Sequence, residues 1–127
     1  MLPDVVAFLE SAGVGTGGSD IFMGRLPVAP AVCLALRESG GEPAQWTQDG
    51  VLWEKPTIQV LARHTDYASG RALIEAAYQA LLGMTNVTVG TTRYFNCEPA
   101  GPPAFLEYDE EDRPTFVLNA VLWKELG

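Results

Sequence analysis

The chain has 127 residues, of which 47% are hydrophobic and 19% are charged. This length predicts one domain with a single core, and this composition excludes an intrinsically disordered chain. Sixteen acidic residues against eight basic ones give a net charge of −8, which argues against a surface that grips DNA or docks on anionic lipid.

The chain begins with a pattern typical of a short helix followed by a glycine-rich loop. Pro3 and Asp4 suit the first turn of a helix, and an apolar stripe continues over residues 3–12. The loop over residues 13–20 contains four glycines, but it follows a helix and holds no lysine. Because a phosphate-binding loop follows a strand and carries a lysine, this pattern does not indicate a nucleotide site.

Three strands are predicted between this loop and the middle of the chain. The first covers residues 20–26, and the second is an apolar run over residues 31–38. Alanine and leucine also suit a helix in that run, but the flanking prolines and glycines favour a strand buried on both faces. Residues 39–50 read as a polar loop, with Pro56 at the start or edge of the next extended segment. Alternation over residues 57–64 predicts a half-buried strand.

The clearest element is a helix that starts after Thr65 or Asp66, either of which can cap it. Its wide apolar face continues to Gly83, and glycine commonly follows the last turn of a helix.

The last third of the chain predicts strands separated by a rigid break. Residues 86–98 read as one long strand with a bulge at Gly90, and residues 99–103 contain three prolines. Residues 104–108 and 115–125 then form a hairpin with an acidic tip. The order of elements predicts an α+β fold, in which two helices pack on one face of a mostly antiparallel sheet.

The sequence contains no recognisable targeting signal, and its cysteines are typical of a reducing compartment, so we expect a cytoplasmic protein. No apolar run is long enough to span a bilayer, and the first ten residues carry Asp4 and Glu10 but no basic region. Cys33 and Cys97 lie far apart in strand-like runs, which predicts two buried thiols rather than a disulfide or a metal site.

Few side chains suggest chemistry. His64 is the single histidine, and a lone histidine at a strand end is more often structural than catalytic or metal-binding. Three tryptophans suit a core or a subunit interface: Trp46, Trp53 and Trp123. The acidic run comprises Glu107, Asp109, Glu110, Glu111 and Asp112. It fits a solvated hairpin tip, a surface that repels a polyanion or, less well in spacing, a calcium site; in each case it should be exposed.

The ordered set of motifs resembles the phage minor-capsid or tail-terminator family of long-tailed bacteriophages and prophages, over roughly residues 3–125. The segments that carry the resemblance are Asp-Ile-Phe-Met-Gly-Arg-Leu-Pro at 20–27, Glu-Ser-Gly-Gly-Glu-Pro at 38–43, Pro-Thr-Ile-Gln-Val-Leu-Ala-Arg at 56–63, Asp-Tyr at 66–67 and the hairpin at 109–119.

The resemblance implies a subunit that assembles with copies of itself as a ring, commonly of six. Such a ring caps the head-proximal end of the tail tube, stops its growth and offers a surface to the head-completion or connector protein. The resemblance implies no catalysis and no cofactor, and a location in the virion after assembly in the host cytoplasm. Arg63 and the turn at 109–114 match the family's recurring polar positions, although the family pattern has a glycine where this chain has Asp112.

These implications lead to residue-level hypotheses. DNA would pass through the ring without specific binding, so we expect the acidic tip to face the lumen or a neighbouring subunit. Arg63 and Arg113 are expected to pair with acidic groups across the subunit interface, where Trp123 also lies. Two alternatives remain: a small binding module that uses a groove between helix and sheet, and a small hydrolase that uses His64 with Cys97 or Asp66.

Overall fold

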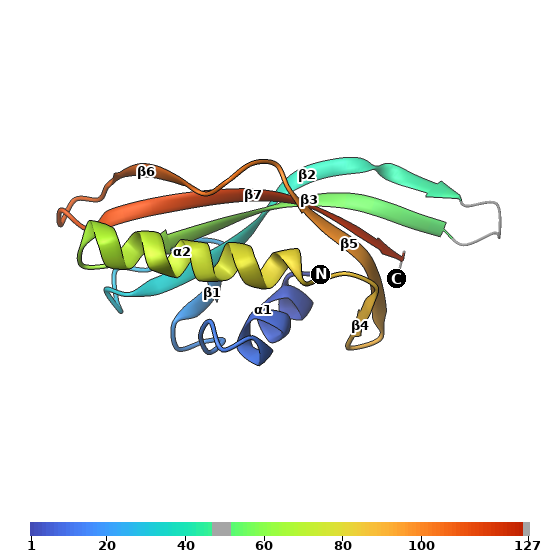
Figure 1. Ribbon diagram of the computed structural model, residues 1–127, viewed down its shortest axis with the longest axis horizontal. Coiled ribbons are helices and arrows are strands. Elements are labelled where there is room, and N and C mark those ends of the chain that lie inside the picture. The colour runs from blue at the N-terminus through green and yellow to red at the C-terminus, as the bar shows by residue number, and fades with distance from the viewer. Residues whose placement is uncertain (47–51, 126–127) are drawn as a thin grey trace.

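The computed structural model describes residues 1–46 and 52–125, which form two helices and a seven-stranded sheet (Figure 1). In chain order, the elements are α1 (Leu2–Ser11), β1 (Ile21–Met23), β2 (Cys33–Trp46), β3 (Leu52–Arg63), α2 (Tyr67–Leu82), β4 (Val87–Val89), β5 (Thr92–Pro99), β6 (Ala104–Tyr108) and β7 (Pro114–Glu125). Both helices lie on the same face of the sheet (Figure 1). The predicted α+β fold is therefore confirmed.

The strands follow the order β1-β2-β3-β7-β5-β4, and β6 also pairs with β7. The β1–β2 pair is parallel, whereas the other pairs are antiparallel. β7 has two partners on the edge that faces away from β3: β5 pairs with its C-terminal half and β6 with its N-terminal half. β6 is therefore a short strand at the rim of the sheet.

Both predicted helices are confirmed, with boundaries set by the expected residues. Asp66 is the N-cap of α2, and its carboxylate accepts a hydrogen bond of 2.9 Å from the backbone N–H of Ser69. Gly83 follows the last turn.

The core lies between the sheet and the two helices. Alternate residues of β7 are buried as predicted, and they pack with apolar side chains from α1, α2, β2 and β3. The phenol of the buried Tyr94 on β5 donates a hydrogen bond of 2.6 Å to the carboxylate of Asp4, which ties α1 to the sheet. The largest fully buried side chains are Tyr94, Phe116, Leu9, Ile21, Leu34, Leu36, Ile58, Ile74, Leu81, Met84, Leu118 and Leu122.

The predicted loop over residues 39–50 is wrong for residues 39–46, which belong to β2; residues 47–50 lie outside the described part of the chain. Pro56 was expected at a strand start or edge, but it lies inside β3, between β2 and β7. The pairing slips between Glu38 and Gly40, and Gly41 then faces Pro56 with φ +146°. A Cβ on Gly41 would lie 2.7 Å from the Cα of Pro56. The glycines therefore carry β2 past the proline instead of turning the chain.

The single strand predicted over residues 86–98 is also wrong, because it divides into β4 and β5. Val89 and Thr92 pair across a two-residue connection in which Gly90 has φ +62°. A hairpin this tight requires a positive φ, so Gly90 forms a turn rather than a bulge.

Candidate assembly surface

Arg63, the last residue of β3, is buried and uses its guanidinium to hold the segment that leads into β2. The whole residue is 3% exposed. Nε donates a hydrogen bond of 3.1 Å to the carbonyl of Ala31, and Nη2 donates one of 2.7 Å to the carbonyl of Pro30. Nη2 also lies 3.3 Å from the Sγ of Cys33. A buried charge with these partners fixes the path of the backbone around it.

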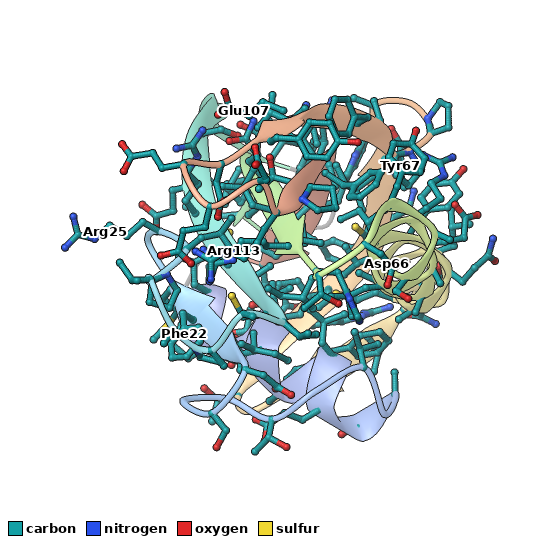
Figure 2. All side chains as sticks on the ribbon, turned by 90° about the vertical axis from the view of Figure 1, so that its left-hand side faces the viewer. Phe22, Arg25, Asp66, Tyr67, Glu107 and Arg113 are labelled. Atoms are coloured by element: carbon teal, nitrogen blue, oxygen red, sulfur yellow. The ribbon has the colours of Figure 1, made fainter. Side chains whose placement is uncertain are left out.

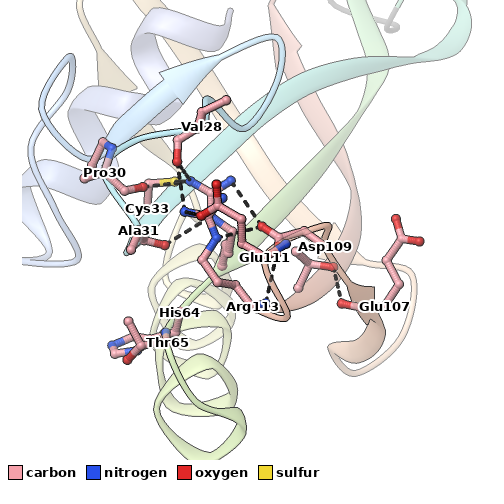
Figure 3. Close-up of polar contacts among 12 residues, drawn as sticks. Val28, Pro30, Ala31, Cys33, His64, Thr65, Glu107, Asp109, Glu111 and Arg113 are labelled. Carbon is pink, nitrogen blue, oxygen red and sulfur yellow. Dashed lines mark hydrogen bonds and ion pairs between the residues drawn. The ribbon is translucent and has the colours of Figure 1, made fainter.

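Asp109 joins Arg63 to a second arginine, Arg113, which Figure 3 labels beside Asp109. The Nε of Arg113 donates a hydrogen bond of 2.8 Å to the Oδ2 of Asp109, and the Nη1 of Arg63 lies 3.9 Å from the same oxygen. The Nη1 of Arg113 donates a hydrogen bond of 2.8 Å to the carbonyl of Val28. We call Arg63, Asp109 and Arg113 the arginine clasp, because it links residues 28–33, the end of β3 and the β6–β7 turn.

Asp109 also shapes the turn between β6 and β7. Its Oδ1 accepts hydrogen bonds of 2.9 Å from the backbone N–H groups of Glu111 and Arg113. Desolvation opposes ionisation, but the hydrogen bonds from Arg113 outweigh it, so the pKa of Asp109 lies below its usual value. Asp112 has φ +58°, in the left-handed region that glycine adopts without strain. The turn therefore has at Asp112 the conformation that suits the glycine of the family pattern.

The acidic tip is exposed as predicted at four of its five positions; the side chain of Asp109 is 22% exposed and belongs to the arginine clasp. The carboxylate of Glu111 lies 3.5 Å from the Nη1 of Arg113. Within residues 1–46 and 52–125, no group of three or more histidine, cysteine or acidic side chains is placed to hold a metal ion. The four exposed residues are Glu107, Glu110, Glu111 and Asp112.

Arg63 and Arg113 were expected to meet acidic groups of another subunit. The structure places both of them on Asp109 of the same chain. Partners of these arginines across a subunit interface stay a prediction. The clasp could not be predicted from the sequence, because it depends on the backbone carbonyls of residues 28–31, and the side chains of these residues do not indicate that role.

Trp123 lies half-buried on the sheet face opposite the helices, since its neighbours in β7 point into the core. Its ring stacks on Trp53 with a centroid distance of 5.0 Å and an interplanar angle of 4°. The Nζ of Lys55 lies 4.2 Å from the centre of the Trp123 ring. The Nε1 of Trp123 is buried without a hydrogen-bond partner among the described residues. The side chain of Trp46 lies outside the described residues.

A second ionic contact, also missed by sequence reasoning, lies near this stack on the helix side of the sheet. The Nζ of the buried Lys124 is 2.6 Å from a carboxylate oxygen of Glu54. The two residues are opposite each other in the β3–β7 pairing. The signal was the alternation of β7, which puts position 124 on the buried face.

Large apolar side chains are exposed around β6. We call Tyr67, Phe105, Leu106 and Tyr108 the β6 edge surface; their exposed fractions run from 37% to 54%. Figure 2 looks onto this end of the molecule, where Tyr67 of α2, Glu107 of β6 and Arg113 are labelled. The consecutive apolar residues at the start of β6, which do not alternate with polar ones, are the sequence signal for such a surface.

The residues considered for catalysis have structural partners. The Nδ1 of His64 accepts a hydrogen bond of 2.8 Å from the backbone N–H of Thr65, and Asp66 caps α2. Burial raises the pKa of Cys97 to about 12, so this thiol is protonated at neutral pH. Burial also raises the pKa of Cys33. These contacts supply no activated nucleophile for His64 among the described residues.

The groove expected of a binding module corresponds to an open hollow between α1 and β1. Its lining includes Val6, Ile21 and Phe22, with Glu10 as the charged side chain among its lining residues. No cluster of polar groups converges there in the described part of the chain, so the hollow offers little specificity for a small ligand.

Comparisons with known proteins agree with this fold. The sequence matches the family described as bacteriophage tail terminator protein over residues 8–125. A chain of the solved structure "Virion of native gene transfer agent (GTA) particle" superposes with a TM-score of 0.56 and 13% identity, over 96% of this chain and 84% of that one. At this identity the likeness shows a shared fold. Comparison with curated proteins gave no match. In the described residues, no helix is long and apolar enough to cross a membrane.

Proposed function

The chain belongs to the bacteriophage tail terminator family and is a structural protein of the virion, and we propose that it forms a ring that caps the head-proximal end of the tail tube. The ring, of six copies, stops polymerisation of the tube protein. Its opposite face receives the head-completion or connector protein. The family match over most of the chain is the observation that carries this proposal.

The distribution of exposed apolar groups supports assembly into a ring. A closed ring uses a heterologous interface, in which two different surfaces of the chain meet. The stacked rings of Trp53 and Trp123 lie on the sheet face opposite the helices, at the end of the sheet away from the arginine clasp. Val28, 75% exposed, adds to the apolar area beside the arginine clasp. These two regions differ enough to act as the unlike halves of one interface, and the β6 edge surface lies outside both.

In this proposal, the exposed carboxylates of the acidic tip face the lumen or the neighbouring subunit. DNA that passes through the ring is a polyanion, and a wall of like charge keeps it from binding. The arginine clasp supports the arrangement because it fixes the turn that carries these carboxylates.

Arg63, Arg113 and Trp123 contribute to the subunit interface in the same proposal. The clasp sets the shape of residues 28–33 and of the β6–β7 turn, which together form the contact area. The stack of Trp53 and Trp123 supplies an apolar surface on the sheet face opposite the helices.

The decisive experiment mixes the purified chain with tail tubes and images them by negative-stain electron microscopy. We expect capped tube ends and, by analytical ultracentrifugation, a species of about 82 kDa, six times the 13.7 kDa chain. Tubes are essential, because a subunit can stay monomeric until it meets them. Uncapped tubes together with a 13.7 kDa species at every concentration would reject the proposal.

The lumen assignment has its own test. Replacing Glu110, Glu111 and Asp112 with lysine should leave rings intact but slow DNA passage, since the lysines would bind phosphates. Glu10→Lys and Glu75→Lys on the helices, made together, provide a control for charge reversal elsewhere. Infectivity equal to that of the unmodified phage would contradict a lumen role for the tip.

A further inference from the structure

β6 leaves one edge of its backbone without a strand partner. It pairs with β7 through one edge, and no described strand pairs with the other. All five of its side chains are exposed. Unpaired N–H and C=O groups along a strand edge accept a further strand, and natural proteins usually protect such edges with lysine or proline. The sequence of β6, Ala-Phe-Leu-Glu-Tyr, contains neither.

An ordered row of aromatic rings lies beside this free edge. The β6–β7 pairing has an irregularity between Phe105 and Glu107. Because of this extra residue, Phe105 and Tyr108 come to the same face, with ring centroids 5.1 Å apart. Tyr67 of α2 extends the row at 5.5 Å from Phe105, and the buried Phe116 supports it at 5.7 Å. The rings are thus held in place while remaining exposed.

The charge at the C-terminal end of this edge is negative and not neutralised within the described residues, whereas Arg71, beside the start of β6, is paired with Glu75. Among the described residues, no cation forms an ion pair with Glu107, Glu110 or Asp112. The neighbouring cations of the arginine clasp are already bound to Asp109 and Glu111. With a net charge of −8 on every copy, pairing two such edges would bring carboxylates together. The edge therefore suits a partner of opposite charge rather than its own copy.

We propose that the free edge of β6 binds an extended, basic segment of a neighbouring virion protein, which adds to the sheet as a further strand. The inference deepens the proposed function and rests on it, because it assigns a contact between the ring and an adjoining protein. Backbone hydrogen bonds provide the affinity of such an addition. Alternate apolar side chains of the segment pack on Tyr67, Phe105 and Tyr108, and its basic side chains meet Glu107, which leaves the carboxylates of residues 110–112 free.

The test measures binding of short fluorescent peptides to the full chain by anisotropy. The probe is a peptide in which valine alternates with lysine. One comparison peptide has glutamate in place of lysine, and another is N-methylated at every residue, which removes its backbone donors on both edges. We expect the lysine peptide to bind and both comparison peptides to fail, because strand addition needs the backbone donors and the edge needs cations.

Two variants locate the site on the chain. Glu107→Lys should weaken binding of the lysine peptide about tenfold or more, because like charges then face each other. Leu106→Lys should weaken it as well, since it protects the strand edge. Glu10→Lys on α1 makes the same charge change at a distant exposed position and should have little effect. Circular dichroism confirms that each variant is folded.

Several outcomes would overturn the inference. One is that the N-methylated peptide binds as tightly as the lysine peptide. Another is that Glu10→Lys weakens binding as much as Glu107→Lys does. A third is that the lysine peptide does not bind the unmodified chain. If none of the peptides binds the chain, and the Leu106→Lys variant no longer forms rings, then a second copy occupies the edge and the inference is wrong. Negative-stain imaging with tail tubes keeps the two proposals apart: a chain that binds the lysine peptide but never caps tubes rejects only the ring.

Discussion

At one end of the sheet, Arg63 and Arg113 hold residues 28–31 and the β6–β7 turn, which lie outside the strand pairing, whereas at the other end Trp53 and Trp123 stack across two strands that are already paired. The arginine clasp therefore determines where residues 28–33 and the β6–β7 turn lie. The tryptophan stack adds stability to a geometry that the backbone has already set. The difference separates residues that position a surface from residues that reinforce a sheet.

The largest effect is expected from Arg63→Ala. This change leaves the carbonyls of Pro30 and Ala31 without their donors, so we expect the free energy of unfolding to fall by about 3 kcal/mol. Denaturant unfolding measures the loss. Arg63→Lys keeps the charge but not the planar donor geometry, and should give an intermediate value. A loss below about 1 kcal/mol in Arg63→Ala would show that the clasp is not needed.

Trp123→Ala should cost less, about 2 kcal/mol, because the lost ring is half-buried and its strand pairing remains. Near-ultraviolet circular dichroism reports the coupling of the two stacked indoles, which should disappear. Trp123→Phe retains an aromatic ring and should keep most of the stability. An unchanged spectrum in Trp123→Ala would contradict the stack.

Acid should weaken the clasp through Asp109, with a smaller effect. The folded chain lowers the pKa of this carboxyl below its ordinary value of about 3.9, so ionised Asp109 contributes stability above that pH. The contribution is lost as the pH falls through the folded pKa, because the unfolded chain then binds the proton more strongly. Asp109→Asn should therefore show a shallower loss of stability below about pH 4.

Asp66→Asn provides the matched control for this measurement. Asparagine still caps α2, and the variant removes a second carboxyl whose pKa is lowered by the hydrogen bond from the backbone N–H of Ser69. The part of the acid-induced loss of stability that is due to Asp109 should persist in the Asp66→Asn variant. An acid response in Asp109→Asn as steep as in the unmodified chain would assign the effect to other groups.

The smallest effect is expected at Asp112, whose φ of +58° strains any residue with a Cβ. Asp112→Gly should raise the free energy of unfolding by about 0.5–1 kcal/mol. Asp112→Ala keeps the Cβ and loses the polar group, so it should not stabilise. Thermal unfolding of the Asp112→Gly and Asp112→Ala variants measures the difference in stability between them. If Asp112→Gly is less stable than the unmodified chain, the carboxylate of Asp112 makes a stabilising contact.

The two helices and the β6–β7 hairpin could be predicted from the sequence because their signals are local. Asp66 and Gly83 bound α2, and an alternating pattern marks β7. The path of β2 could not be predicted, because two consecutive glycines, Gly40 and Gly41, are typical of a turn. Their actual role depends on Pro56, which is close to them only in the folded chain.

The candidate site was predicted in part for the same reason. The acidic tip is a contiguous run and was found directly. The clasp depends on Asp109 lying beside Arg63, which is 46 positions earlier in the chain. It also depends on backbone carbonyls, whose positions cannot be read from the residue types. The free edge of β6 follows from the division of the β7 edge between two partners, which is a property of the topology.

The two thiols have a consequence for a particle that leaves its host. Cys33 and Cys97 are unpaired and buried, and burial raises the pKa of both. Thiolates, rather than thiols, react with oxidants, and access to the sulfur also controls the rate. A virion outside its host meets air-saturated surroundings, and burial protects these sulfurs there from oxidation and from mixed disulfides. The packing of the core thus also provides chemical durability outside the cell.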